Sequence, residues 1–314
     1  MIRPLRLSDA PRYIDMLIGY FPEEEELLGG RREAYERFAH RLYRWDVRLA
    51  LGFLALIRRP VFRAFCMEAD GKLVATAVVT FTKRAGYIGA VMTDATYRRR
   101  GLAHRLVAEC VRTAHSYGKP YAVLDVLSRN TPARALYDKM GFRALREQIV
   151  AVHDRPASRS DSPARLASII RPFRRSDRQP LVEVARTVLA PGFVEILPPS
   201  ARDYDLSSVL IRGLESDSAA WVIASNGVVN GFVRATKSEA TEAGNLSAPL
   251  LARNVAPEAG VALVQTAVAW LAERHVPRIV TEYAAEDLAA GNALSSAGFH
   301  EVRRTWTLYR ASDN

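Results

Sequence analysis

The sequence predicts an α+β fold, an α/β sandwich arranged as two domains in tandem. Three observations lead to this prediction. Strand-like and helix-like runs alternate along the chain, a short motif occurs twice, and a polar segment separates its two copies. The motif IRPLRLSD at Ile2–Asp9 returns as IRPFRRSD at Ile170–Asp177. A length of 314 residues also suits two domains better than one.

The segment between the two copies is predicted to be a linker. From His153 to Arg165 the chain is polar, rich in Ser and Pro, and lacks an apolar period, which is typical of a connection. We therefore expect one domain at residues 1–152, a linker at 153–168 and a second domain at 169–314.

Each copy of the motif is expected to form a short strand that leads into a helix. The Ser-Asp pair at its end suits helix capping, and helix-like runs follow at Pro11–Ile18 and Pro180–Leu189. Residues 20–60 look helical and irregular. Their apolar run, Leu49–Ile57, is too short to span a bilayer; a buried or capping helix is the main interpretation and an interfacial helix the alternative.

Three strands and a helix are expected next. Phe62–Ala69 and Lys72–Thr82 flank Asp70-Gly71, a dipeptide typical of tight hairpin turns, and Tyr87–Thr93 continues the β pattern. An amphipathic helix from about Gly101 to Ser116 is then indicated by an apolar stripe of Leu102, Leu106, Val107, Cys110, Val111 and Ala114.

The first half is predicted to end as strand, helix and strand. Tyr121–Ser128 is apolar except at Asp125, as expected of a central strand. Thr131 is the expected N-cap of a helix that has Pro132 at its first position and that ends before Gly141. A further strand is expected at residues 142–152.

The loop between Thr93 and the helix that follows has the features of an anion-binding site. A strand that ends in a Gly-containing loop and opens a helix presents free backbone N–H groups and the positive end of a dipole. Arg98, Arg99 and Arg100 precede Gly101 there and add fork-shaped cationic donors. An arginine triplet alone more often marks solvated surface, but this placement favours a phosphate or pyrophosphate ligand.

The order of elements and two motifs resemble the Gcn5-related N-acetyltransferase (GNAT) superfamily. The acyl-CoA pyrophosphate loop of that family, Arg/Gln-x-x-Gly-x-Gly/Ala, is met by Arg98, Gly101 and Ala103. Its Asn-x-x-Ala-x-x-Leu-Tyr-x-x-x-Gly-Phe signature is met by Asn130, Ala133, Leu136, Tyr137, Gly141 and Phe142. The resemblance covers residues 1 to about 152. It implies two tandem GNAT-like domains, each a mixed, mostly antiparallel sheet flanked by helices.

The resemblance also implies roles for individual residues. The acetyl-CoA pyrophosphate would lie on the loop Arg98–Ala103, which includes Arg99, Arg100, Gly101 and Leu102, and the pantetheine arm would lie along the strand backbone near Met92 and Thr93. Asn130 would bind the pantetheine or nearby backbone. Tyr137 would protonate the leaving sulfur or donate a hydrogen bond to it, because a phenol with a pKa near ~10 is protonated at neutral pH.

The general base is left open by the sequence. Asp94, Glu68 and Asp125 lie on or next to the central strands, and a chain of waters could serve instead. A structural role explains each carboxylate better than a catalytic one, so none is chosen. The acidic run Glu23–Glu26 falls where members of this family often bind the acceptor. It could attract a cationic amine, and the alternative is a solvated helix start.

The second half repeats the outline without the anion-binding loop. Strands are expected at 221–224, 228–236, 246–255 and 278–283, with a helix at 261–273. Pro257 is followed by Glu258, Ala259 and Gly260, with no arginine. Counted back from Gly298-Phe299, Asp287 takes the place of the signature Asn and Leu294 that of the Tyr. We expect a degenerate domain without a working acyl-CoA site.

Composition narrows the possible functions. Residues 1–150 hold 26 Lys+Arg against 16 Asp+Glu, and residues 169–314 hold 15 against 16, so the basic excess lies with the proposed anion site. No basic recognition helix is apparent, so no nucleic-acid partner is expected. Cys66 and Cys110 lie in apolar patterns and suggest buried thiols in a reducing, cytoplasmic setting. No metal-ligand spacing and no secretory segment are recognised.

The sequence thus predicts an N-acetyltransferase. It would move an acetyl group from acetyl-CoA to a primary amine of an unidentified acceptor, a small molecule or a protein, with the chemistry in the N-terminal domain. The alternatives are a non-catalytic acyl-CoA-binding regulatory module and a nucleic-acid binder that uses the basic first half.

Overall fold

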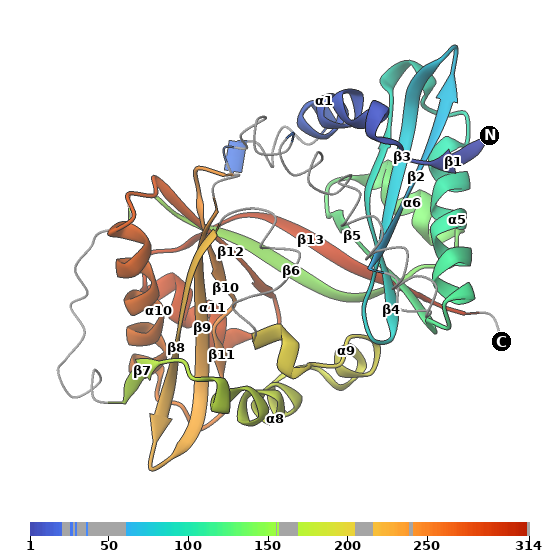
Figure 1. Ribbon diagram of the computed structural model, residues 1–314. Helices are drawn as coiled ribbons and strands as arrows, with labels where there is room; N and C mark the ends of the chain where they lie inside the picture. Colours follow the sequence, from blue (N-terminus) through green and yellow to red (C-terminus); the bar gives the residue numbers. More distant parts are fainter. Residues whose placement is uncertain are drawn as a thin grey trace. The chain divides into compact units, whose positions relative to one another are not determined.

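The computed structural model describes residues 1–20, 26–27, 29, 36, 61–154, 156, 169–204, 216–238 and 241–312. The predicted features at Glu23–Glu25, at Leu49–Ile57 and over nearly all of the linker lie outside these residues. The chain forms two compact units, shown in Figure 1. The first comprises Met1–Glu25, Arg32–Leu145 and Trp306–Asn314, and the second comprises Glu26–Arg31 and Arg146–Thr305.

The first unit is a mixed sheet with helices against it, as the fold class predicted. Its described sheet has the order β1-β2-β3-β4-β5-β13, antiparallel from β1 to β4 and parallel between β4 and β5. The elements are β1 (Ile2–Pro4), η1 (Leu7–Asp9), α1 (Ala10–Tyr20), β2 (Phe62–Ala69), β3 (Lys72–Phe81), β4 (Ala85–Thr93), η2 (Ala95–Tyr97), α5 (Leu102–Ser116), β5 (Tyr121–Leu127), α6 (Thr131–Lys139) and the end of β13 (His300–Ala311).

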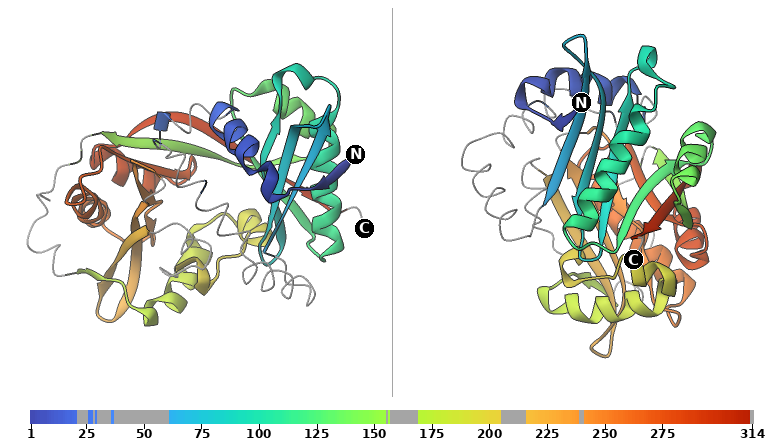
Figure 2. Two further views of the ribbon diagram at one scale, coloured as in Figure 1. Left: turned by 45° about the horizontal axis from the view of Figure 1, so that its top comes forward. Right: turned by 90° about the vertical axis from the view of Figure 1, so that its right-hand side faces the viewer.

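Helices α1 and α5 lie on opposite faces of this sheet (Figure 2). The predicted stripe of α5 is confirmed, because its apolar residues from Leu106 to Ala114 are buried against β3 and β4. Gly86 of β4 lets this helix come close, since a Cβ there would meet the Ala114 side chain at 2.5 Å. On the other face, Met16 of α1 packs with Cys66, Leu73 and Met92.

Strand β4 bends where its partnership with β5 ends. The parallel pairing runs from Ala85↔Tyr121 to Ile88↔Leu124 and goes no further along the described strands. On the other edge, the register with β3 shifts between Thr76 and Val78, and Ala90 has a positive φ of 49°. A bulge of this kind bends a strand. The two strands therefore separate beyond Ile88, and one edge of β4 from Gly89 to Thr93 is left without a strand partner among the described residues.

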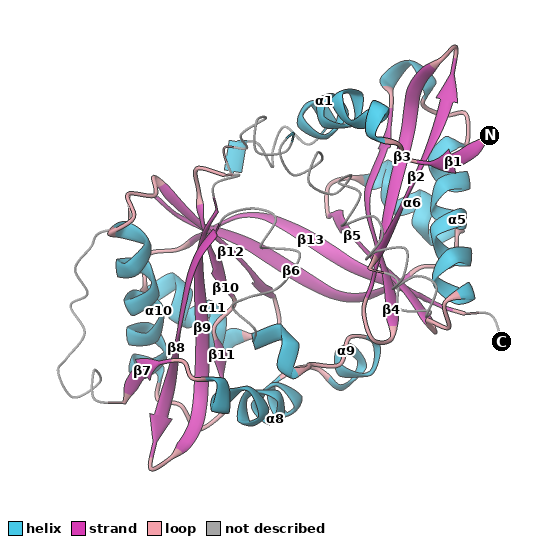
Figure 3. Ribbon diagram, in the orientation of Figure 1, coloured by secondary structure: helices cyan, strands magenta, loops and turns pink. Residues whose placement is uncertain are grey.

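The second unit repeats this plan, and Figure 3 shows its helices and strands. Its described sheet has the order β6-β12-β10-β9-β8-β7, with β10 and β12 parallel and the other neighbouring pairs antiparallel. The elements are β6 (Arg143–Asp154), β7 (Ile170–Pro172), η3 (Arg175–Asp177), α8 (Arg178–Val188), α9 (Pro191–Ile196), η4 (Ala201–Tyr204), β8 (Ser216–Ser225), β9 (Val228–Ser238), β10 (Gly244–Ser247), β11 (Leu250–Leu251), α10 (Pro257–Ala272), β12 (Arg278–Ala284) and α11 (Leu288–Ser296).

The predicted hairpin turn at Asp70-Gly71 is present, and the second unit has a turn of the same kind. Asp70-Gly71 joins β2 to β3 and Asn226-Gly227 joins β8 to β9, and all four residues have the positive φ that such turns require. The single strand expected at residues 246–255 was wrong in its extent. The chain forms β10 and β11 instead, with a break at Ala248-Pro249, because proline cannot donate to a strand ladder.

Each unit is completed by a strand from the other half of the sequence. From Arg146 onward β6 belongs to the second unit, where it pairs with β12 over Gln148–Asp154. From Trp306 onward β13 belongs to the first unit, where it lies next to β5. The ranges 1–152 and 169–314 therefore mark the two copies of the repeated sequence. The compact units differ from these ranges, because most of β6 belongs to the second unit and the end of β13 belongs to the first.

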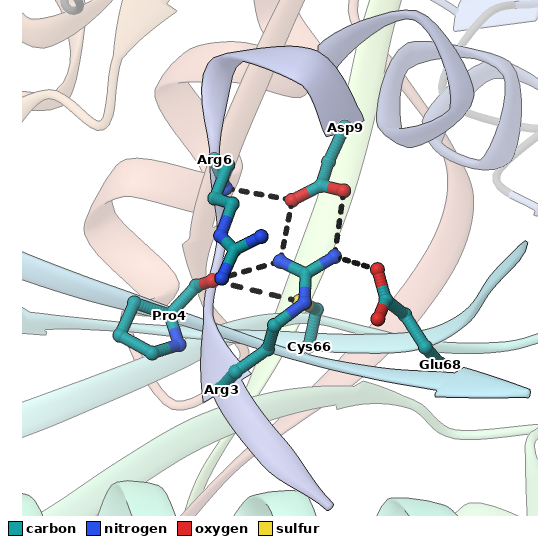
Figure 4. A network of polar contacts seen from close by, with 6 residues as sticks. All are labelled: Arg3, Pro4, Arg6, Asp9, Cys66 and Glu68. Carbon is teal, nitrogen blue, oxygen red and sulfur yellow. Dashed lines mark hydrogen bonds and ion pairs between the residues drawn. The ribbon is translucent and has the colours of Figure 1, made fainter. Parts of the chain in front are cut away.

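The repeated motif builds the same polar cluster twice. Arg3 donates to Asp9 from Nη1 at 2.7 Å and from Nη2 at 2.8 Å, and the Arg6 backbone N–H donates to the same carboxylate at 2.7 Å (Figure 4). In the second unit, Arg171 donates to Asp177 twice at 2.8 Å, and the Arg174 N–H donates at 2.7 Å. The aspartate thus fixes the turn between strand and helix, which is a structural role.

Candidate acyl-CoA site

The loop between β4 and α5 is shaped by two left-handed residues. Asp94 caps η2 by accepting from the Thr96 backbone N–H at 3.1 Å and from the Thr96 hydroxyl at 2.8 Å, and these bonds lower the pKa of its carboxyl. The chain then turns through Arg99, at φ 62°, and Gly101, at φ 73°, before α5 begins. Left-handed backbone costs an L-residue roughly 1–2 kcal/mol, so strain is held at this turn.

The backbone N–H groups of the turn are unpaired within the described chain. Among the described residues, no backbone carbonyl accepts from the N–H groups of residues 99 to 104, and the first bond of α5 runs from the Arg105 N–H to the Gly101 carbonyl at 3.1 Å. A Cβ built on Gly101 meets nothing within 4 Å. Free N–H groups, the N-terminus of a 15-residue helix and open space together suit an anion.

The three arginines are not equivalent. The Arg98 guanidinium lies 5.5 Å from the centre of the Tyr20 ring, and its Nε donates to the Thr93 carbonyl at 3.4 Å. Arg100 lies 4.8 Å from the Tyr97 ring centre and donates to the Thr96 carbonyl at 3.2 Å. Arg99 is exposed and has no partner within the described chain. Arg98 and Arg100 therefore brace the loop, and Arg99 is the cation that is free to meet a ligand.

Met92 and Thr93 lie on the free edge of β4. Their other edge pairs with β3, at Thr76↔Met92 and Ala75↔Thr93. The Met92 side chain is buried under α1, so only its backbone faces the opening. Thr93 Oγ1 is buried and has no hydrogen-bond partner in the described part of the chain. The strand thus offers unpaired backbone groups next to the anion-binding turn.

Asn130 caps α6. Its side-chain oxygen accepts from the Ala133 N–H at 3.2 Å, so the N-cap is Asn130, not Thr131 as predicted, and Pro132 is the second helical residue. Asp287 of the second unit caps α11 in the same way, accepting from the Ala290 N–H at 3.0 Å. The first residue of the signature therefore has a structural reason in both units. The Asn130 amide nitrogen has no bond among the described residues and is left for other contacts.

Tyr137 is almost buried, with 6% of its surface exposed. Its ring packs edge-on against Phe142, with ring centres 5.8 Å apart. Burial raises the pKa of its hydroxyl to about 12, so the group is a proton-bearing donor at neutral pH. The hydroxyl has no hydrogen-bond partner among the described residues, yet it is not one of the fully enclosed atoms. It is therefore an unused donor that reaches the surface.

The three carboxylates considered as bases all have partners. Glu68 pairs with Arg3, and Asp94 caps η2 and pairs with Arg12 at 2.5 Å. Asp125 accepts from the Tyr87 hydroxyl and, at 2.7 Å, from the Thr307 hydroxyl. The last contact joins positions 182 apart in the chain, so no sequence pattern pointed to Thr307. Gly89, where the unpaired edge of β4 begins, was not singled out in the sequence either, although a glycine inside a strand is a recognised signal.

The matching region of the second unit is built differently. Helix α10 begins after Ala256 with Pro257, and no residue of the connection from β11 to α10 is left-handed. A Cβ on Gly260 would meet Leu251 Cδ1 at 2.9 Å and the Ala293 Cβ at 3.6 Å, so β11, α10 and α11 are in close contact. Leu294, in the place of Tyr137, is 1% exposed. The second unit thus lacks the left-handed glycine that precedes α5, and the tyrosine of the signature is replaced by a buried leucine.

No helix among the described residues is long and apolar enough to cross a membrane. The same residues contain no group of three or more His, Cys, Asp and Glu side chains placed to hold a metal ion.

Part of the sequence is similar to a known family. The sequence profile of the acetyltransferase (GNAT) family matches residues 21–142, and no curated protein sequence matches the chain. The likeness to the GNAT family in sequence therefore covers residues 21–142, which include the loop Arg98–Gly101, Asn130 and Tyr137.

Solved structures extend the likeness to the whole chain. A tandem GNAT protein from the clavulanic acid biosynthesis pathway is 13% identical, with a TM-score of 0.69 over 100% of this chain and 99% of that one. A Gcn5-related N-acetyltransferase from Sphaerobacter thermophilus is 16% identical, with a TM-score of 0.62 over 99% and 95%. At these identities the likeness establishes the fold, and the chain has the fold of tandem GNAT proteins.

Proposed function

We propose that this protein is an acetyl-CoA-dependent N-acetyltransferase and that its chemistry takes place in the first unit. The observation that carries the proposal is the turn at Arg99–Gly101, with its free N–H groups and open space at the start of α5. The family of residues 21–142 supports acyl transfer in general. Acetyl-CoA as donor and a primary amine as acceptor are the specific part of the proposal.

The residues of the first unit fit acetyl-CoA as the acyl donor. The N–H groups from Arg99 to Ala103 and the Arg99 side chain would hold the pyrophosphate, with Leu102 at the first position of α5 and with Arg98 and Arg100 bracing the loop. The unpaired edge of β4 at Met92 and Thr93 would run beside the pantetheine, and the free amide nitrogen of Asn130 would meet it. When bound, acetyl-CoA supplies an activated acyl group.

The reaction needs few groups from the protein. The neutral amine attacks the thioester carbonyl carbon, the N–C bond forms, the C–S bond breaks, and the nitrogen gives up one proton to solvent while the thiolate gains one. Tyr137 is placed on the helix that follows the separated strands and bears a proton. With a pKa near 12 it holds this proton more strongly than a thiol with a pKa of ~8.5. Its role is therefore a hydrogen bond to the departing sulfur.

Tyr137→Phe tests this role. We expect kcat in a thiol-release assay, with acetyl-CoA and a panel of primary amines, to fall about 10²-fold or more, while the affinity for acetyl-CoA measured by calorimetry stays within about threefold. The pH profile of the wild-type protein should show no loss from tyrosine ionisation up to about pH 10, because the neutral phenol is the active form. An unchanged kcat in the variant would exclude the role.

The competing function is a non-catalytic acyl-CoA-binding module, which the turn at Gly101 would also serve. Tyr137 favours the enzyme, because a module that only binds acyl-CoA does not need a hydroxyl donor without a partner on α6. Tight binding of acetyl-CoA without thiol release for any amine would favour the module. Binding to nucleic acid that weakens steeply as salt is added, without binding of acetyl-CoA, would contradict both the enzyme and the acyl-CoA-binding module.

A further inference from the structure

Helix α1 carries a row of three side chains, Arg12, Met16 and Tyr20, at a spacing of four residues. Residues at this spacing lie on the same side of a helix. Met16, in the middle of the row, is 1% exposed and packs with Met92 of β4. This packing fixes α1 on the sheet, so that Arg12 and Tyr20 lie within reach of the loop that follows β4.

Both polar side chains of the row bond to that loop. Arg12 Nη2 donates to Asp94 Oδ2 at 2.5 Å. The Tyr20 hydroxyl accepts from the Ala95 backbone N–H at 3.2 Å and hydrogen-bonds to the Asp94 carboxylate. The Arg98 guanidinium lies over the Tyr20 ring, 5.5 Å from its centre. The contacts from α1 therefore reach both ends of η2, just before the anion-binding turn.

The turn needs support of this kind. Arg99 is a non-glycine residue in the left-handed region, and such a residue persists only where the surrounding structure holds it. The loop residues on the N-terminal side of Arg99 are the ones that α1 contacts. A loop that is already held in its binding shape loses less conformational freedom when a ligand binds. Contacts that fix this loop should therefore increase its affinity for an anion.

The second unit shows that the fold itself does not require these contacts. Helix α8 has the same length as α1, 11 residues, and follows the same motif. The Arg–Asp cluster that Figure 4 shows for the first unit is repeated in the second. Counted from the motif, however, the positions of the row on α8 hold only apolar side chains, those of Pro180, Val184 and Val188. The second unit also lacks the left-handed turn. The polar row thus accompanies the turn.

We propose that Arg12 and Tyr20 are positioning residues for the acyl donor, which hold the loop after β4 in the shape that binds its pyrophosphate. They act through Asp94, Ala95 and Arg98 and do not touch the ligand. The inference rests on the proposed function and adds to it a part for α1 in binding the donor. It follows that a ligand with a pyrophosphate depends on Arg12 and Tyr20, whereas the thioester arm alone does not.

Variants of the two side chains in the full-length protein test this role. Tyr20→Phe keeps the ring under Arg98 and removes the hydroxyl, so it should lower the affinity for acetyl-CoA, measured by calorimetry, by about five- to tenfold. Arg12→Met should lower this affinity about threefold, as expected for the loss of a partly exposed ion pair. Arg12→Lys keeps the charge and should retain most of the affinity.

Two partial ligands show where the loss arises. Inorganic pyrophosphate lacks the thioester arm, and S-acetylpantetheine lacks the pyrophosphate. Both are titrated by NMR, the first through the amide signal of Leu102 and the second through that of Thr93. Tyr20→Phe and Arg12→Met should weaken pyrophosphate by the same factor as acetyl-CoA. The affinity for S-acetylpantetheine should stay within about twofold, because α1 acts only on the loop. A general loss of structure would weaken both.

The chain offers a matched control for each variant. The Tyr117 hydroxyl accepts from Arg63 Nη2 at 2.9 Å, and the Arg63 guanidinium lies 5.7 Å from the Tyr117 ring centre, at the far end of α5. Tyr117→Phe therefore removes a comparable hydroxyl away from the turn. Arg186→Met removes an ion pair with Glu183, at 3.0 Å, from the surface of α8. Neither control should change the affinity for acetyl-CoA or for pyrophosphate.

The outcomes separate this inference from the proposed function. Unchanged affinity for acetyl-CoA in both Tyr20→Phe and Arg12→Met, or an equal loss for pyrophosphate and S-acetylpantetheine, would overturn the inference, and thiol release by the wild-type protein would still support the proposed function. If Tyr20→Phe weakens acetyl-CoA and pyrophosphate alone but no amine releases thiol, the proposed transfer fails and the positioning role stands. The expected result in the transfer assay is a higher KM for acetyl-CoA in Tyr20→Phe, with kcat little changed.

Discussion

At the scale of residues, the repeated Arg–Asp pair links pH to stability. The pKa of Asp177 is lowered, first by the hydrogen bonds from Arg171 and then by the Arg174 N–H, and the pKa of Asp9 is lowered in the same way by Arg3 and Arg6. A carboxyl whose pKa is lower in the folded state stabilises the fold above its unfolded pKa of ~3.9. This stabilisation is lost as the pH falls through the lower, folded value.

Asp177→Asn should therefore cost about 2–3 kcal/mol at pH 7, because a charged, nearly buried hydrogen-bond acceptor is removed. The variant should also lose less stability than the wild type when the pH is lowered below about 4. Urea unfolding from pH 7 to pH 3 checks both points. Equal slopes for the two proteins in the acid range would show that the pair does not contribute in the way described.

At the scale of elements, the two ends of α5 offer a matched test of the anion-binding turn. Gly101 before the helix and Gly118 after it have φ values of 73° and 70°, and a Cβ at either position meets nothing within 4 Å. Gly101→Ala and Gly118→Ala should each destabilise the fold by roughly 1–2 kcal/mol through the same backbone strain. Only Gly101→Ala should weaken acetyl-CoA binding, by about tenfold or more, as measured by calorimetry. Equal affinity in the two variants would place the pyrophosphate elsewhere.

The caps of α6 and α11 allow a second comparison. Asn130→Asp keeps an oxygen that can accept from the Ala133 N–H, whereas Asn130→Ala removes the cap and should cost ~1 kcal/mol. If the Asn130 amide nitrogen also contacts acetyl-CoA, Asn130→Asp should retain the thermal stability and lower the affinity for acetyl-CoA several-fold. Asp287→Asn in the second unit is the control and should leave that affinity unchanged. Full affinity in Asn130→Asp would limit Asn130 to capping.

At the scale of the whole molecule, the exchange of strands predicts that neither half of the sequence is self-sufficient. Residues 306–311 supply Trp306 and Leu308 to the core of the first unit and Thr307 to Asp125. A chain that ends at residue 305 should lose acetyl-CoA binding, although every residue of the proposed site remains. The full-length protein should bind one acetyl-CoA per chain. Binding at full affinity by the truncated chain, or two equivalent sites in calorimetry, would contradict these expectations.

The sequence predicted what depends on neighbours along the chain. The hairpin turn at Asp70-Gly71, the stripe of α5 and the left-handed stop at Gly141 follow from local preferences, and the structure confirms them. The cap at Asn130 was missed by one residue, since Asn and Thr are both good caps. Features that join distant positions were not readable. The shared strands, the contact between Asp125 and Thr307 and the bulge at Ala90 depend on which strands meet, and no local pattern encodes that.

The place of β13 has a consequence for biosynthesis. Apart from Glu26–Arg31, the second unit is one continuous stretch, Arg146–Thr305, so its sheet can assemble as soon as that stretch has left the ribosome. The first unit is translated earlier, yet the strand beside β5 arrives only with residues 306–311. Domains usually fold in the order in which they are made. Here the unit made first is finished last, so a nascent chain that stalls before residue 306 would hold a complete second unit and an unfinished first one.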